Sequence, residues 1–130
     1  TYHIARYAVL LCYLGEPEKA MEQIKRAMGI DPFCSDLVLE TEGLCNFVSG
    51  EFESAIASFK KMQIETRTSL FYTAASLRKI GKSEDAKRVL KVAQTESGME
   101  NEKFVASQLF QRESDKSSLS GALEEIQASL

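Results

Sequence analysis

Three glycines recur along the chain, and each is followed five residues later by an alanine. The pairs are Gly15 with Ala20, Gly50 with Ala55, and Gly81 with Ala86. The glycines are 35 and 31 residues apart, and a period of about 34 residues is typical of stacked helix pairs. The sequence therefore predicts an internal repeat whose unit is two helices joined by a tight turn.

The residue types in this pattern have a physical reason. Glycine ends a helix at little cost because it enters the left-handed conformation readily. Five residues later the second helix crosses the first, and a side chain larger than alanine would hold the two backbones apart. Positions four and seven residues after each alanine lie on the same helical face and are also apolar or small. They are Ile24, Phe59 and Leu90, followed by Ala27, Met62 and Ala93.

The rest of the composition agrees with an all-α chain. Hydrophobic residues make up 44% of the 130 residues, which is enough to bury the core of one domain. The only prolines are Pro17, which fits the first turn of a helix, and Pro32, which lies in a link between units. No alternation of β-branched residues predicts a strand.

These residues resemble the tetratricopeptide repeat (TPR) over roughly residues 1–98. The resemblance is carried by the segments LCYLGEPEKAMEQIKRAMGIDP, LCNFVSGEFESAIASFKKM and FYTAASLRKIGKSEDAKRVLKVA. The Asp-Pro that ends the first unit has no equivalent after the second or third. The resemblance implies three helix-turn-helix units, at about 1–34, 35–67 and 68–98, stacked as a right-handed superhelical solenoid. Because the first helix has nothing ahead to cover it, we expect further repeats upstream.

Residues 99–130 are expected to form one more helix, from about Glu100 to Gln111, and a capping helix from about Ser117 to Ser129. This tail resembles the C-terminal repeat modules of bacterial nucleotide cyclases and of winged-helix transcriptional regulators, although their proline is missing here. The matching residues are Leu109, Phe110, Asp115, Leu119, Leu123 and Ile126. The last three place one apolar face on the final helix.

No feature of the sequence indicates catalysis, a cofactor or a metal site. His3 is the only histidine, and no phosphate-binding glycine loop or zinc motif is present. The three cysteines, Cys12, Cys34 and Cys45, are odd in number and lack metal spacing, which favours free thiols in a reducing, cytoplasmic environment. No apolar run is long enough for a membrane span. We therefore expect a chain that is not an enzyme.

The remaining function is recognition of a protein partner. The TPR resemblance implies that the first helix of each unit lines a groove. Its expected members are Tyr2, Arg6, Val9, Tyr13, Leu37, Leu44, Phe47, Phe71, Tyr72 and Arg78. Aromatic and apolar side chains dominate this set, which suits a helix or an extended peptide with apolar anchors. Some members could instead be core residues, Tyr13 or Tyr72 in particular.

One kind of partner is excluded by residue type. TPR domains that capture acidic C-terminal peptides present lysine, asparagine and arginine in the groove. The equivalent positions here are Ala5, Val9, Thr41, Thr68 and Tyr72. We therefore expect no carboxylate clamp.

Charge is distributed unevenly along the chain. Residues 1–65, 66–98 and 99–130 carry net charges of −4, +4 and −3. The positive residues of the third unit fall largely on its second helix, and they are Lys82, Lys87, Arg88 and Lys91. They could contact an acidic partner, but the total of −3 and the lack of interleaved aromatic residues make nucleic acid an improbable ligand.

Two functional hypotheses follow. The first is a non-catalytic interaction module that binds a protein or peptide in its groove as a regulatory part of a larger bacterial signalling protein. The alternative is a homodimerisation or cis-regulatory domain of a nucleotide cyclase or DNA-binding transcriptional activator. The uncovered first helix and the apolar groove are the surfaces through which copies would pair.

Overall fold

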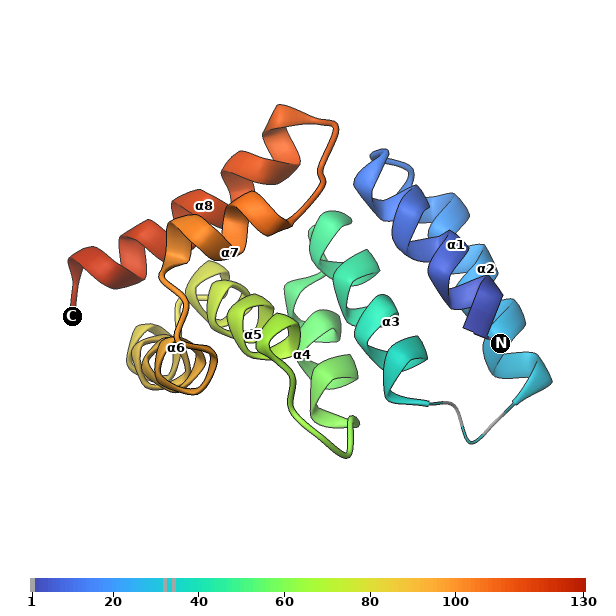
Figure 1. The fold of residues 1–130 in the computed structure, drawn as a ribbon, viewed down its shortest axis with the longest axis horizontal. Helices are drawn as coiled ribbons and strands as arrows, with labels where there is room; N and C mark the ends of the chain where they lie inside the picture. The colour runs from blue at the N-terminus through green and yellow to red at the C-terminus, as the bar shows by residue number, and fades with distance from the viewer. Residues whose placement is uncertain (1, 32, 34) are drawn as a thin grey trace.

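The computed structural model describes residues 2–31, 33 and 35–130, and for Tyr2 the backbone alone. The described part of the chain contains eight α-helices and no strand, which confirms the all-α prediction (Figure 1). The helices are α1 (Tyr2–Tyr13), α2 (Pro17–Ile30), α3 (Asp36–Val48), α4 (Phe52–Lys60), α5 (Arg67–Lys79), α6 (Ser83–Ser97), α7 (Asn101–Ser107) and α8 (Glu113–Ala128).

The first six helices pack as three consecutive pairs. α1 packs on α2, α3 on α4, and α5 on α6. Each later pair also contacts the one before it, because α3 packs on both α1 and α2, and α5 packs on both α3 and α4. Figure 1 shows the pairs side by side, from the N-terminal pair on the right to the third pair on the left.

The three predicted glycine turns share one geometry. Gly15, Gly50 and Gly81 have φ angles of +79°, +81° and +83°, all in the left-handed region. In the first turn the Gly15 N–H donates to the Cys12 carbonyl at 3.0 Å, and the Glu16 N–H donates to the Leu11 carbonyl at 2.9 Å. The other two turns repeat these bonds at equivalent positions. The prediction that glycine closes each first helix is confirmed.

The predicted helix crossings are also present. Ala20, Ala55 and Ala86 have no exposed surface, and the apolar positions that follow them on the same face are all buried. α3 and α4 come especially close at Gly43, where an added Cβ would collide with the Phe59 ring. Small side chains at these crossings allow the paired helices to approach each other closely.

The link between the second and third pairs is anchored to α3. The Asp36 carboxylate accepts the backbone N–H groups of Gln63 and Ile64 at 2.9 and 3.0 Å. The hydroxyl of Thr66, the N-cap of α5, donates to Glu40 at 2.6 Å. These bonds hold the start of α5 against the helix pair that precedes it.

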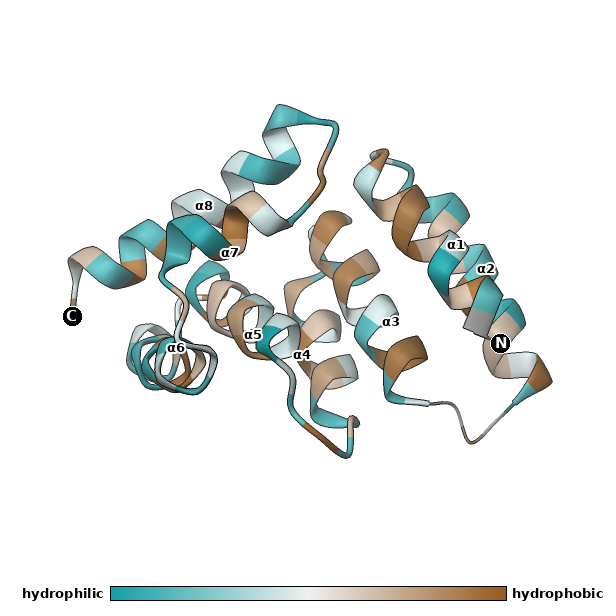
Figure 2. Cartoon of the chain, in the orientation of Figure 1, coloured by the Kyte–Doolittle hydropathy of each residue, from teal (hydrophilic) through white to brown (hydrophobic). Residues whose placement is uncertain are grey.

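The C-terminal helices differ from their predicted bounds. α7 ends at Ser107, and α8 begins at Glu113, four residues before the predicted start. The connection between them has an extended backbone at Gln108 and Arg112. It includes a brown, apolar stretch in Figure 2 and reaches toward the turn between α1 and α2 in Figure 1.

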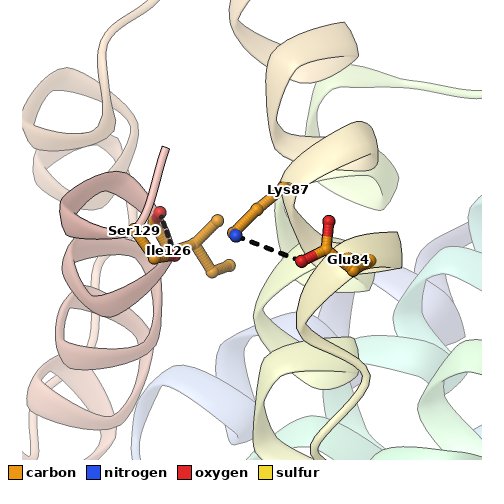
Figure 3. A network of polar contacts seen from close by, with 4 residues as sticks. All are labelled: Glu84, Lys87, Ile126 and Ser129. Carbon is orange, nitrogen blue, oxygen red and sulfur yellow. Dashed lines mark hydrogen bonds and ion pairs between the residues drawn. The ribbon is translucent and has the colours of Figure 1, made fainter.

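α8 packs its predicted apolar face on the third pair. Leu119, Leu123 and Ile126 are buried, and α8 contacts both α5 and α6. Figure 3 shows Lys87 of α6 extending toward Ile126 while its amino group pairs with Glu84 at 3.2 Å. None of the helices in the described ranges is long and apolar enough to span a bilayer.

Candidate interaction surface

The predicted groove residues lie on α1, α3 and α5, and we call the surface formed by these three helices the first-helix face. Four of them are core residues: Leu44, Phe47, Phe71 and Tyr72 are buried. The prediction that these four side chains line an open groove is wrong. The alternative considered for Tyr72, that it belongs to the core, is the one observed.

Aromatic packing explains why these side chains are buried. The Phe47 and Tyr72 rings meet edge to face with centroids 5.1 Å apart, which joins α3 to α5. Phe104 of α7 stacks on Phe71 with centroids 4.2 Å apart and meets Tyr72 edge-on at 5.6 Å. Aromatic pairs at such separations are favourable beyond the area they bury. The C-terminal part of the chain therefore covers the third pair.

The other predicted groove residues are more accessible. Val9, Tyr13 and Leu37 are half-buried, and Arg6 is exposed. Arg78 pairs with Glu125 of α8 at 2.7 Å between its guanidinium and the carboxylate. The side chain of Tyr2 lies outside the described residues. A role in partner binding stays a prediction for these positions.

The segment from Phe104 to Arg112 crosses the first-helix face, and we call it the cover segment. Its central contact is the Gln108 side chain, whose Oε1 accepts hydrogen bonds from two tyrosine hydroxyls. Tyr72 of α5 donates at 2.8 Å, and Tyr13 of α1 donates at 3.1 Å. One amide oxygen therefore joins the third pair to the first.

The remainder of the cover segment lies on the end of the first pair. The Phe110 ring meets Tyr13 edge-on with centroids 5.2 Å apart, and the Gln111 N–H donates to the Tyr13 carbonyl at 2.8 Å. Arg112 lies against Gly15, where an added Cβ would collide with the arginine side chain. Arg112 also forms two hydrogen bonds, at 2.9 and 3.0 Å, with Asp115 in the first turn of α8.

α7 ends at Ser107, and the backbone at Gln108 is extended. In this conformation the Gln108 amide oxygen accepts hydrogen bonds from the hydroxyls of Tyr13 and Tyr72. Burial raises the pKa of Tyr72 well above 10.0 and raises the pKa of Tyr13. Both hydroxyls therefore remain protonated donors at neutral pH.

The cover segment is not evident from the sequence. Leu109 and Phe110 were noted only as part of the tail resemblance, and Phe104 and Gln108 received no role in binding. The available signal was Phe104, a large aromatic residue that follows the polar stretch ENEK. Such a residue favours a buried contact, although its position in the chain does not show with which partner.

A second feature of the first pair is an exposed apolar stripe that runs along α1 and includes Leu14, the residue that follows the helix. Tyr7, Leu10 and Leu14 are 52, 58 and 54% exposed. Counted back from the turn glycine, Leu10 corresponds to Cys45 in α3 and Ser76 in α5, and both of these are buried. Cys45 lies against the first pair, with its Sγ 3.4 Å from the Pro17 carbonyl. At this one position of the stripe, the equivalent residues of α3 and α5 are thus buried, whereas Leu10 is exposed.

The cysteines of this region are buried thiols. Cys12 and Cys45 are free, as predicted, with their sulfur atoms 3.5 Å apart. The hydrogen bond with Cys45, together with burial, raises the pKa of the Cys12 thiol, which makes it a poor nucleophile. Cys34 lies outside the described residues.

The positive residues of α6 are partly neutralised locally. Lys87 pairs with Glu84 at 3.2 Å, and Arg88 pairs with Asp85 at 2.9 Å. Among the described residues, no group of three or more histidine, cysteine or acidic side chains is arranged to hold a metal ion.

The first-helix face is thus contacted by the end of α7 and by the non-helical connection that follows it, in which the backbone is extended at Gln108 and Arg112. It offers hydroxyl donors, a backbone acceptor and an aromatic ring. No family model, curated protein or solved structure matches this chain.

Proposed function

We propose that this chain is a non-catalytic interaction module of the TPR type, with its helix pairs stacked as a right-handed superhelix. In this proposal, a partner protein places an extended segment on the first-helix face, and the module acts as a regulatory part of a larger signalling protein. The observation that carries the proposal is the cover segment itself. Its non-helical part, which follows α7, contacts both the first and the third pair.

The contacts of the cover segment are those used in peptide recognition. Tyr13 supplies a hydroxyl donor, a carbonyl acceptor and a ring. Backbone hydrogen bonds bind any extended chain, whereas the side-chain contacts select among sequences. Tyrosine suits this role because it presents a large amphipathic surface at a small cost in conformational entropy.

The cover segment also competes with a partner for the first-helix face, which weakens the apparent affinity of the partner. A tethered segment has an effective concentration on the order of millimolar at its own site, so a separate peptide must overcome this competition. The part of the cover most open to exchange is the connection between α7 and α8, in which Leu109 is 65% exposed. Phe104 is fully buried and is expected to stay in place.

The proposal is tested by selecting peptides from a random display library. The target is the Gln108→Ala/Phe110→Ala variant, in which the cover has lost its side-chain contacts with Tyr13. We expect selected peptides to reduce amide hydrogen exchange at the ends of α1 and α5 and to bind wild-type protein more weakly. The proposal fails if no peptide is selected, or if all selected peptides protect other surfaces.

Homodimerisation is a second candidate, favoured by the stripe of Tyr7, Leu10 and Leu14. These three half-exposed side chains offer far less than the roughly 800 Å² per partner of a typical stable interface, so a dimer would need further surface. Light scattering coupled to size exclusion tests this candidate. A dimer that Leu10→Glu dissociates would support it, and a wild-type monomer at high concentration would exclude it.

A further inference from the structure

We propose that the first-helix face recognises an extended peptide with the pattern glutamine, any residue, aromatic residue, and then any residue except proline. This inference rests on the proposed function and specifies its ligand. The cover residues from Gln108 to Gln111 are then an internal copy of the ligand, and a partner segment of the same pattern replaces them.

The glutamine position follows from the two converging hydroxyl donors. Tyr13 and Tyr72 donate to the same oxygen, so any ligand must place an acceptor there. Tyr72 is fully buried, and within the described part of the chain its hydroxyl donates to Gln108. A buried hydroxyl that loses its acceptor leaves the cost of its desolvation uncompensated. An aliphatic side chain at this position would leave both donors unsatisfied.

The surrounding charges favour an amide over a carboxylate. Burial is the main cause that raises the pKa of Tyr72 and of Tyr13, and nearby negative charge raises each pKa further, from Asp115 and Glu40 at Tyr72 and from Glu40 at Tyr13. Arg6 acts in the opposite direction at Tyr13, and Arg112 is paired with Asp115. A ligand carboxylate would add a negative charge near two acids, whereas a neutral amide accepts the same hydrogen bonds without that repulsion.

The other three positions follow from the rest of the connection. The side chain of Leu109 is largely exposed, so this position does not select a residue. Phe110 packs edge-on against Tyr13, which selects an aromatic ring. The Gln111 N–H donates to the Tyr13 carbonyl, so proline, which lacks this donor, cannot occupy the fourth position without losing the bond.

The test measures binding of a fluorescent peptide, SQLFQR, which corresponds to residues 107–112. Fluorescence anisotropy is recorded with the Gln108→Ala/Phe110→Ala protein and with the wild type. We expect the variant to bind the peptide, and the wild type to bind it at least tenfold more weakly because the intact cover competes. If the double variant does not fold, the single Phe110→Ala variant replaces it, since that ring is only half-buried.

Peptide variants test each position. We expect Gln108→Ala and Phe110→Ala in the peptide to weaken binding on the order of tenfold each. Gln108→Glu and Gln111→Pro should also weaken it. Leu109→Ala is the matched control and should change the affinity by less than twofold. Tyr13→Phe in the protein should weaken binding of the parent peptide but not of the Gln108→Ala peptide, because only the former uses the hydroxyl.

The outcomes separate this inference from the proposed function. Equal binding of the parent and Gln108→Ala peptides would overturn the pattern. The pattern also fails if SQLFQR does not bind while display-selected peptides protect the first-helix face, although the proposed function would then stand. If neither kind of peptide binds this face, both are wrong.

Discussion

The first and third helix pairs share one turn geometry and differ in what lies around them. Gly15 and Gly81 adopt nearly the same left-handed φ, and Ala20 and Ala86 are equally buried. Yet α1 exposes an apolar stripe, whereas α5 is enclosed by the second pair on one side and by α7 and α8 on another. The repeat pattern therefore determines how a pair is built, and the neighbouring elements determine which of its side chains are exposed.

The largest effect is expected when the Phe104 ring, which covers the third pair, is removed. Phe104→Ala deletes a fully buried side chain that stacks on Phe71, and we expect it to lower the free energy of unfolding by about 3–5 kcal/mol. Leu109→Ala, in the exposed part of the same segment, is the control and should change stability little. Urea denaturation measures both. A Phe104→Ala loss below about 1 kcal/mol would show that the cover does not stabilise the third pair.

The next effect concerns the two hydrogen bonds of Gln108 that join the first pair to the third. Gln108→Leu preserves much of the side-chain volume but removes the acceptor of two tyrosine hydroxyls, so we expect a loss of about 1–3 kcal/mol. Gln111→Leu is a matched glutamine substitution, because this exposed residue contributes its backbone N–H to the site. Equal stability of the two variants in denaturant titrations would argue against the bridge.

Alkaline pH should weaken the same bridge. The folded-state pKa of Tyr72 is raised above 10.0, so above pH 10 the unfolded chain binds fewer protons than the folded one. Stability is then complete below pH 10 and falls as the pH rises, by at most about 1.4 kcal/mol per pH unit for each such tyrosine. Thermal unfolding between pH 8 and 11 measures this, and Tyr72→Phe should flatten the decline. An unchanged slope in Tyr72→Phe would exclude this residue as the cause.

Two glycine substitutions compare the pairs directly. Gly15→Ala and Gly81→Ala each place a side chain in the left-handed region, at a cost of about 1–2 kcal/mol. Only at Gly15 does the new methyl group collide with Arg112, whereas nothing lies near it at Gly81. Because the arginine is flexible, we expect Gly15→Ala to cost up to about 1 kcal/mol more in denaturant titrations. A smaller loss at Gly15 than at Gly81 would contradict the packing of the cover on the first turn.

The smallest effects are expected at the equivalent positions Leu10 and Ser76. Leu10→Ser changes an exposed side chain and should alter stability by no more than about 0.5 kcal/mol. Ser76→Ala should be neutral or slightly stabilising, because the Ser76 hydroxyl is buried with no hydrogen-bond partner among the described residues. Calorimetric melting of both variants checks this, and a large loss in Leu10→Ser would reveal a covering contact on α1 in solution.

Local features of the fold were predictable because they depend on residues close together in the sequence. A glycine in the left-handed region and an alanine five residues later define each turn and crossing, whatever the rest of the chain does. The ends of α7 and α8 were not predictable in the same way. Gln108 leaves α7 where it meets Tyr13 and Tyr72, which lie 95 and 36 residues away in the sequence.

The candidate site shows the same division. From residue type and repeat position, Phe47, Phe71 and Tyr72 are predicted on the first helices. The sequence could not show that other elements cover these side chains. Whether an aromatic residue on a helix faces a partner or the core depends on which other element packs on it.

By itself, the sequence determined an all-α chain with three glycine-closed helix pairs and small residues at the crossings, because glycine conformation and helical periodicity act locally. Only the tertiary structure decided that the first-helix face is crossed by the chain's own C-terminal segment and that the α1 stripe is left exposed. The physical reason is that a side chain is buried, or finds its hydrogen-bond partner, through residues that are near it in space but can be far from it in the sequence. A single oxygen of Gln108 can serve two hydroxyls from distant helices only after the pairs have stacked.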